Sequence, residues 1–249
     1  MLLILSFFVA SCSQPAKKLE IVAHRGANNL APENTFAAAQ KCIDLNIDYV
    51  EIDIRSSQDD VFYILHDKTL NRTTNGTGAI KDRPSSYIDT LDAGSWFSSE
   101  FKDERVPRLE PYLNEFQGKI KVYFDVKDAD LSRLVSLVYR TGFEKDCFFW
   151  FSNDTRARQL RDIDKNLPLK MNAQDIPGLE KVMPYNPRII ETRLESVSPD
   201  FVTFCRQNKL KIMVNALEKG SENKYQEIID SPIDMVNLDK ADLMIDLMK

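Results

Sequence analysis

The feature that most constrains the fold is an alternation of short apolar runs and amphipathic stripes that continues along nearly the whole chain. Stripes with helical spacing, such as Leu131, Leu134, Val135 and Val138, separate most of the runs. Strands that alternate with helices form right-handed parallel units. About eight such units predict an α/β protein, a (β/α)8 TIM barrel rather than an open sheet. The eight strand candidates are residues 19–23, 49–54, 61–65, 119–126, 147–151, 168–172, 210–214 and 234–238, and Arg188–Glu191 is a weaker candidate.

Titratable side chains gather where these predicted strands end. Both histidines of the chain, His24 and His66, directly follow an apolar run. Glu51 and Asp53 lie one residue apart in a β-branched run, so they share one side of the strand. Parallel barrel strands have no solvated face, and two like charges inside a barrel need a cation or a base between them. With Asp125 at the end of the fourth run, these residues predict a catalytic site at the C-terminal face of the barrel. Packed histidines and a solvated strand face are the alternative interpretation.

Composition excludes one class of partner. A net charge of −5 and a pI near 5.3 argue against a nucleic-acid binder, which would carry a basic patch or stripe. With 43% hydrophobic residues the chain can bury a sizeable core. Cys42, Cys147 and Cys205 have no metal-type spacing and are expected to be buried small hydrophobes.

The first 18 residues are expected to be separate from the barrel, which would occupy residues 19–249. Leu2–Ala10 is an apolar run too short to span a bilayer but suited to a signal sequence. It ends in Val9-Ala10-Ser11-Cys12, which resembles the cleavage box of bacterial lipoproteins. That resemblance implies a lipid on Cys12 and attachment to a membrane of the bacterial cell envelope, on a periplasmic or surface face. An ordinary secretory signal is the alternative.

A polar stretch at residues 68–118 interrupts the alternation after the third predicted strand. It is too long for an ordinary loop, which predicts a functional insertion. Trp96 and Phe97, within this stretch, could form the floor of a substrate pocket or cover the barrel core.

An ordered set of motifs over the first half of the chain resembles the glycerophosphodiester phosphodiesterase family, of the PLC-like phosphodiesterase superfamily. The motifs are His24-Arg25-Gly26, Pro32-Glu33-Asn34-Thr35, Glu51-x-Asp53, His66-Asp67, Asn71-Arg72-Thr73-Thr74 and Val106-Pro107-x-Leu109-Glu110. Beyond Lys127 the resemblance rests on the alternation and on a closing strand that ends in aspartate, Asp234–Asp239.

The resemblance implies a metal-dependent barrel hydrolase that converts glycerophosphodiesters to sn-glycerol 3-phosphate and an alcohol, with the insertion capping the mouth. Glu51, Asp53 and Asp125 would hold Mg²⁺ or Ca²⁺ through oxygen. His24 and His66 would be the acid–base pair, because imidazole titrates near neutral pH. For Arg25 and Lys127 the implied role is to bind the substrate, Arg25 at a phosphate oxygen and Lys127 at the phosphate or the glycerol end. A salt bridge to a nearby carboxylate is the alternative for each.

The chain departs from the family pattern at two places. Asp125-Val126-Lys127 stands where Glu-x-Lys is usual, so Asp125 is either a shorter metal ligand or a structural ion-pair partner. Ile212 stands where a tryptophan expected to line the substrate mouth is common. These departures leave room for one alternative, a non-catalytic lipoprotein that binds headgroups. A second alternative is phospholipase D-type action on an intact phospholipid, which a lipid anchor would favour and the long insertion weighs against.

Overall fold

The computed structural model describes residues 19–217 and 222–249, which form nine strands and nine α-helices. The strands are β1 (Glu20–Ala23), β2 (Tyr49–Ser56), β3 (Phe62–Ile64), β4 (Lys121–Val126), β5 (Cys147–Trp150), β6 (Lys170–Asn172), β7 (Ile189–Thr192), β8 (Lys211–Ala216) and β9 (Met235–Leu238). The helices are α1 (Phe36–Asp44), α2 (Ser85–Ile88), α3 (Leu109–Phe116), α4 (Leu131–Arg140), α5 (Asp154–Ile163), α6 (Ile176–Val182), α7 (Pro199–Gln207), α8 (Glu222–Asp230) and α9 (Ala241–Leu247).

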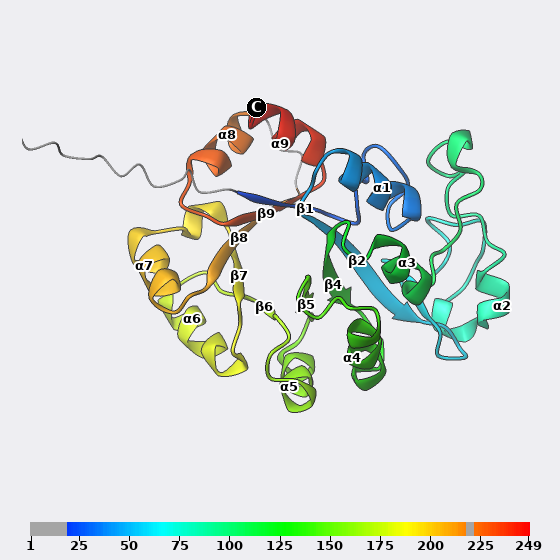
Figure 1. Cartoon of the computed structure of the whole chain (residues 1–249), viewed down its shortest axis with the longest axis horizontal. Coiled ribbons are helices and arrows are strands. Elements are labelled where there is room, and N and C mark those ends of the chain that lie inside the picture. The colour runs from blue at the N-terminus through cyan, green and yellow to red at the C-terminus, as the bar shows by residue number, and fades with distance from the viewer. Residues whose placement is uncertain (1–18, 218–221) are drawn as a thin grey trace, which may run out of the picture.

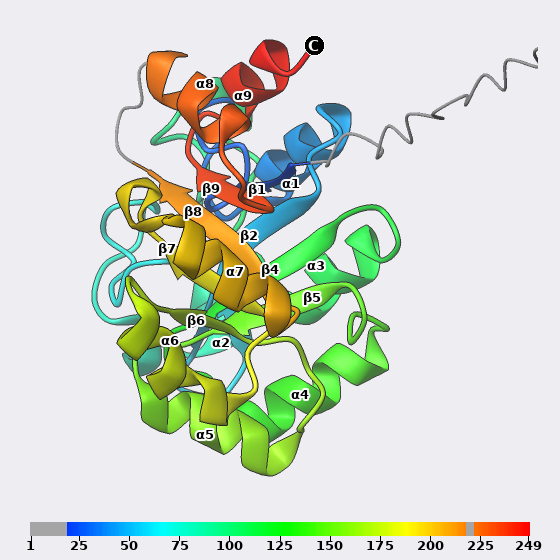
Figure 2. The ribbon, with the colours of Figure 1, turned by 90° about the vertical axis from the view of Figure 1, so that its left-hand side faces the viewer.

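Eight of the strands form the predicted barrel. They are parallel and hydrogen-bonded in the order β5-β4-β2-β1-β9-β8-β7-β6, and a single parallel bridge between Phe149 and Leu169 joins the two ends. The helices lie around the outside of the strands (Figure 1), and a quarter turn shows α6, α7, α8 and α9 along one side of the barrel (Figure 2). The sheet is therefore an almost closed (β/α)8 barrel.

Two strand assignments made from the sequence differ in the structure: one predicted barrel strand lies outside the barrel, and the weaker candidate lies in it. Residues 61–65, predicted as the third barrel strand, contain β3, which pairs antiparallel with the far end of β2 and lies off the barrel path. The weaker candidate Arg188–Glu191 overlaps β7, a barrel strand between β6 and β8. The error has a physical reason: a short apolar run shows burial but not pairing direction. The predicted number of strands was right because one strand replaced the other.

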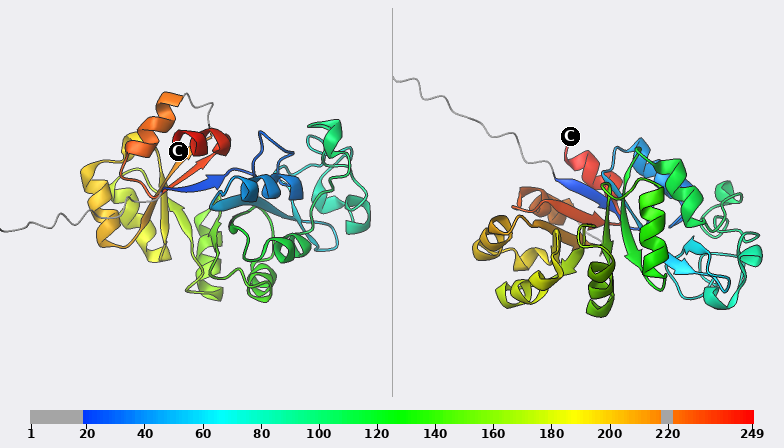
Figure 3. Two further views of the ribbon diagram at one scale, coloured as in Figure 1. Left: turned by 45° about the horizontal axis from the view of Figure 1, so that its top comes forward. Right: turned by 60° about the horizontal axis from the view of Figure 1, so that its bottom comes forward.

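The insertion accordingly falls between the second and third strands of the barrel, β2 and β4. Its residues have a small hydrophobic core of their own, made of Tyr63, Leu65, Leu70, Ile80, Ile88, Leu91, Ala93 and Val106. Both views of Figure 3 show this cyan and teal segment at one edge of the molecule, outside the ring of helices. Helix α3 differs from the rest of residues 68–118, because Leu109, Tyr112, Leu113 and Phe116 pack in the main core. It is a barrel helix, so the separate part of the insertion ends before it.

The helices begin where the sequence supplies a cap. Thr35 accepts a hydrogen bond from the Ala38 amide at α1, and Asp130 does the same for Arg133 at α4. The α4 stripe predicted from the sequence is buried, and Gly142 follows the helix with a φ of 75°.

Inside the barrel, the side chains near the N-terminal ends of the strands form an apolar layer, and those nearer the C-terminal ends form a charged layer. Val22, Tyr49, Tyr123, Phe148, Ile189, Met213 and Met235 form a cluster inside the ring, separate from the main core between sheet and helices. Because side chains alternate, Glu51 and Asp53 follow Tyr49 on the inward face of β2, and Asp125 follows Tyr123 on that of β4. The apolar layer thus supports the carboxylates from below.

The predicted signal and lipidated Cys12 lie outside the described residues. Within the described part of the chain, no helix combines the length and the apolar character that a transmembrane span requires.

Candidate active site

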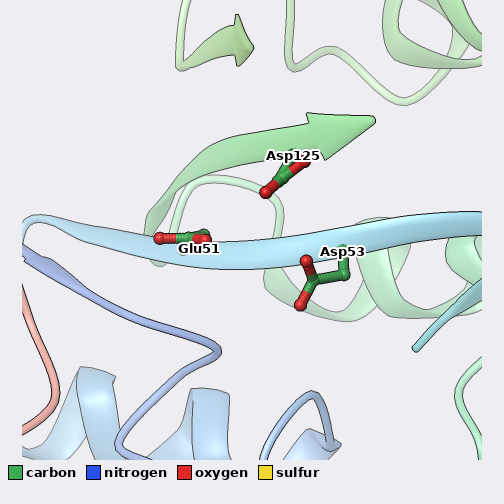
Figure 4. A group of neighbouring side chains, drawn as sticks. All are labelled: Glu51, Asp53 and Asp125. Carbon is green, nitrogen blue, oxygen red and sulfur yellow. The ribbon is translucent and has the colours of Figure 1, made fainter. Parts of the chain in front are cut away.

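Three carboxylates meet at the C-terminal ends of β2 and β4. Figure 4 shows Glu51 and Asp53 on one strand and Asp125 on its neighbour, where Asp53 and Asp125 are direct partners in the strand register. One oxygen from each residue lies within 4.8 Å of the others. All three side chains are almost fully buried. The sequence prediction that they come together is therefore correct in geometry.

The chemistry of this acidic triad fits a divalent cation. Oxygens that bind one Ca²⁺ at about 2.3–2.6 Å can lie no more than about 5 Å apart. Among the described residues, Asp125 Oδ1 is buried and accepts no hydrogen bond, and Asp53 Oδ1 has Lys127 Nζ as its ion-pair partner at 3.0 Å. A buried carboxylate oxygen without a partner is costly, and a cation would satisfy it.

Electrostatics inside the triad are unequal. Burial raises the pKa of Glu51 to about 7, although His24 and Lys170 act in the opposite direction. Burial and the charge of Asp53 raise the pKa of Asp125. For Asp53 burial is outweighed by Lys127 and His66, so its pKa is lowered. In the protein alone, the ionised forms of Glu51 and Asp125 are therefore disfavoured, and a bound cation would stabilise them.

His24 is held from both sides of its ring. Its Nδ1 lies 2.7 Å from Asp239 Oδ1, and Arg25 Nε donates to its Nε2 at 3.2 Å. Nδ1 therefore carries the proton that Asp239 accepts, and the lone pair of Nε2 accepts the hydrogen bond from Arg25. Burial lowers the pKa of His24, but the hydrogen bond to Asp239 and the charge of Glu51, 3.9 Å away, outweigh burial and raise it.

A tight turn places His24 and Arg25. Arg25 has a φ of 56° and Gly26 a φ of 83°. A Cβ at Gly26 would lie 2.7 Å from the Cβ of Ala38, so only glycine fits against α1. The His-Arg-Gly motif is therefore explained by packing as well as by chemistry.

His66 lies on the opposite side of the triad, directly after β3. Its Nδ1 is 2.8 Å from Asp67 Oδ1, and its carbonyl oxygen accepts two hydrogen bonds from Arg55, at 2.9 and 2.7 Å. Arg55 is buried on the inward face of β2 and also binds Asp128. The position of His66 is thus fixed by the strand that carries Glu51.

A chain of ion pairs joins the two histidines along the rim. Arg72 binds both oxygens of Asp67 and both oxygens of Glu33. Glu33 in turn accepts from Arg25 at 3.0 Å, and Arg25 contacts His24. His24 and His66 therefore belong to one network around a common mouth.

The two predicted phosphate-binding residues also lie beside the triad. Lys127 Nζ is 2.6 Å from Asp125 Oδ2 and 3.0 Å from Asp53 Oδ1. Arg25 Nε is 3.8 Å from Asp53 Oδ2. Asp125 is thus an ion-pair partner through one oxygen while its other oxygen stays without a hydrogen bond in the described structure. The two roles considered from the sequence are compatible.

Several residues of the network were missed or undervalued in the sequence. Asn34, interpreted mainly as a helix-start residue, is buried and donates to Asp53 Oδ2 at 2.8 Å, while Thr35 caps the helix. Asn237 donates to Glu51 Oε2 at 2.6 Å, and only its polar character within an apolar strand signalled a role. Asp239 was visible only as the end of the closing strand.

One expectation based on the family pattern is wrong. Ile212, in place of a tryptophan thought to line the mouth, packs in the main core outside the sheet, whereas its neighbour Met213 faces the barrel interior. Side chains alternate along β8, so position 212 cannot reach the mouth. The missing tryptophan therefore removes nothing from the site.

Comparison with known proteins agrees with the motifs. Residues 24–153 match the model of the glycerophosphoryl diester phosphodiesterase family. A crystal structure of glycerophosphodiester phosphodiesterase from Agrobacterium tumefaciens is 37% identical, with a TM-score of 0.85 over 92% of this chain and 100% of that one. The chain belongs to the glycerophosphoryl diester phosphodiesterase family.

Other members of the glycerophosphoryl diester phosphodiesterase family support the assignment. The glycerophosphodiester phosphodiesterase of Caldanaerobacter subterraneus is 28% identical over 93% of this chain and 98% of its own length. Matches to two proteins of Bacillus subtilis cover less of those relatives, 44% and 48% of their length. An Oleispira antarctica phosphodiesterase, solved in complex with the product sn-glycerol-3-phosphate, has the same fold, with 22% identity and a TM-score of 0.82 over 92% of this chain and 96% of that one.

Proposed function

We propose that this enzyme hydrolyses glycerophosphodiesters to sn-glycerol 3-phosphate and an alcohol, with a divalent cation and two histidines. The observation that carries the proposal is the acidic triad, three buried carboxylates with one oxygen each within 4.8 Å of the others, beneath two histidines that share one ion-pair network. The product named in the Oleispira antarctica complex supports the substrate class.

Arg25 and Lys127 would bind the phosphate of the substrate. Each already contacts a carboxylate of the triad, so each has an ammonium or guanidinium group beside the place where the reacting phosphorus would lie. Arg25 is further held by Glu33, which fixes the direction of its donors. These two cations would neutralise the negative charge of the diester.

His24 and His66 would move the protons. One takes a proton from the attacking oxygen and the other gives a proton to the leaving alkoxide. Asp239 and Asp67 each accept a hydrogen bond at Nδ1, which leaves Nε2 of both rings as the atom that exchanges the proton. The positions of the rings around one mouth would allow both transfers without movement of the main chain.

Glu51, Asp53 and Asp125 would hold the cation, which we propose to be Mg²⁺ or Ca²⁺ because all three ligands are hard oxygen donors. When bound, such an ion supplies Lewis-acid stabilisation of the charge that develops on the phosphoryl oxygens. Asn34 and Asn237 would orient Asp53 and Glu51 by the hydrogen bonds already in place.

Purified protein incubated with glycerophosphodiesters and Mg²⁺ or Ca²⁺ should release sn-glycerol 3-phosphate, and chelation should stop the reaction. His24→Ala and His66→Ala should each lower kcat by about 10²- to 10⁴-fold. Asn114→Ala, an exposed change on α3 away from the mouth, is the matched control. Absence of turnover by the wild type, or full turnover by either histidine variant, would reject the proposal. Release of product from a long-chain phospholipid instead would favour phospholipase D-type action.

We also propose that the protein is lipid-anchored through Cys12 in the bacterial cell envelope. The support is the Val9-Ala10-Ser11-Cys12 sequence alone, in a segment outside the described residues. Expression in a bacterium with labelled palmitate should label the wild type, and Cys12→Ala should move the protein from the membrane fraction to the soluble fraction. An unlabelled, membrane-free wild type would contradict the anchor.

A further inference from the structure

A second polar site lies on the other half of the barrel mouth. Where β6, β7 and β8 end, a pocket of about 600 Å³ is lined by Asn172, Gln174, Glu191, Arg193, Asn215 and Lys224, among others. These strands stand across the ring from β2 and β4, which carry the triad (Figure 1). We call this region the amide pocket.

The amide pocket is connected to the acidic triad. Asn215, in its wall, is the strand partner of Asn237, whose amide donates to Glu51 Oε2. Glu191, also in its wall, binds Lys170 inside the barrel, and Lys170 lies close enough to influence Glu51 and Asp125 electrostatically. A substrate with its phosphorus at the triad could therefore place one of its two ester groups in this pocket.

The polar groups of the pocket suit hydroxyl groups. Asn172 and Asn215 project from strand ends and are exposed, so their amides can both donate and accept. Gln174 Oε1 accepts from the Thr192 hydroxyl, the Arg193 amide and the Ser196 hydroxyl, which fixes the two loops that form the wall. The wall is thus held in place before any ligand binds.

The pocket offers no net negative charge to an ammonium group. Glu191 is paired with Lys170 at 2.6 Å, and Lys170 is only 2% exposed. The remaining charged residues of the wall within the described part of the chain are Glu195, Arg193 and Lys224, which together are not negative. A cationic headgroup would gain little here by attraction.

Aromatic side chains do not supply a cation site either. Quaternary ammonium groups are typically bound by aromatic cages, and within the described chain no aromatic residue lines the amide pocket. Trp150 is an aromatic residue at the end of the neighbouring strand β5, but Lys170 Nζ lies 4.7 Å and Lys127 Nζ 5.9 Å from the centre of its ring. This ring already faces two ammonium groups.

We propose that the amide pocket binds the alcohol headgroup of the diester, and that this headgroup is an uncharged polyhydroxy alcohol rather than an ammonium alcohol. The proposal rests on the hydrolysis proposed above. The volume of about 600 Å³ is large for three-carbon glycerol and suits a ring such as inositol. The residues that decide specificity are Asn172 and Asn215.

The test compares diesters that share glycerol phosphate and differ in the headgroup. The kcat/KM for glycerophosphoinositol should exceed that for glycerophosphocholine by about 10-fold or more, because several hydroxyl hydrogen bonds are gained. Asn172→Ala and Asn215→Ala should each lower kcat/KM for the inositol substrate by about 5- to 10-fold, mainly through KM, and for the choline substrate by less than about 2-fold. Asn114→Ala should leave both unchanged.

Three results would overturn the proposal. Preference for glycerophosphocholine would reject the polyol. Equal losses for all headgroups in the two asparagine variants would assign the pocket to the shared glycerol, and no loss would show that the substrate does not reach it. If the wild type hydrolyses none of the diesters, the proposed function fails separately. Calorimetry with the same diesters and His66→Ala then still decides whether the inositol headgroup binds preferentially.

Discussion

Two groups of buried charges lie inside the same barrel, and their difference separates function from stability. The triad on β2 and β4 brings three carboxylates together beside Lys127 and leaves Asp125 Oδ1 without a hydrogen bond within the described structure. On β6 and β7, Lys170 and Glu191 form one ion pair at 2.6 Å, and two aromatic rings lie beside the ammonium group. The first group is electrostatically incomplete and the second is complete. A chain tolerates an incomplete group where a ligand completes it, and the proposed cation and substrate would do so here.

The largest effect is expected at Glu51. Glu51→Gln removes a ligand and should lower kcat/KM by at least about 10³-fold, which is about 4 kcal/mol. The metal-free variant should nevertheless be as stable as the wild type or more stable. The reason is that burial raises the pKa of Glu51 to about 7, so its ionised form is disfavoured in the folded protein. For a group with a raised pKa, stability is fully present below the unfolded pKa and is lost as pH rises towards 7. Urea unfolding at pH 8 with chelator should show the gain, and a loss of stability in the variant would contradict it.

The opposite result is expected for the complete pair. Lys170→Met leaves Glu191 buried without its cation and should lower the free energy of unfolding by about 3 kcal/mol. The double variant Lys170→Met with Glu191→Leu should recover most of that loss, because a buried pair can often be replaced by apolar groups at little cost. Urea unfolding of the single and double variants measures both values. If the single and double variants are equally destabilised, the loss of unfolding free energy comes from packing rather than from charge.

The same contrast explains what could be predicted from the sequence. Glu51 and Asp53 were recognisable because two carboxylates in a β-branched run conflict with burial, and the structure brings them to Asp125 as expected. The buried position of Lys170 was not recognisable, because a single lysine at the start of a short strand is an ordinary surface pattern. Only the parallel pairing of β6 with β7 brings it close to Glu191, whose register partner is Asn172.

The barrel itself was predictable, whereas the role of single strands was not. Periodicity reports burial, and it identified α4 with its cap at Asp130. Whether a short run pairs parallel or antiparallel depends on distant chain, so β3 was placed in the barrel and β7 was undervalued. The same limit hid Asn237 and Asp239, whose importance comes from strands that meet only after closure.

A smaller effect on kcat/KM is expected from a change at Asp239, which holds His24 beside the triad. Asp239→Asn keeps the size of the side chain but weakens the bond that holds Nδ1, and should lower kcat/KM by about 10- to 10²-fold, part of what acid–base catalysis supplies. Asp239 raises the pKa of His24, so its loss lowers that pKa. The limb of the pH–rate profile that His24 controls should move to lower pH. An unchanged profile with reduced kcat would mean that Asp239 only supports the fold.

The smallest effect should come from an ion pair outside the barrel, which shows that burial rather than pairing makes the difference. Arg140 on α4 binds Glu110 on α3 at 2.9 Å, but the two side chains are 60% and 49% exposed. Water and salt screen such a pair, and long side chains lose entropy when it forms. Arg140→Met should therefore change the free energy of unfolding by no more than about 0.5 kcal/mol and leave kcat/KM unchanged. Urea unfolding at low and high salt measures the effect, and any small loss should disappear at high salt. A loss as large as that of Lys170→Met would show that the outer pair is coupled to the barrel, and the contrast between buried and exposed charge would fail.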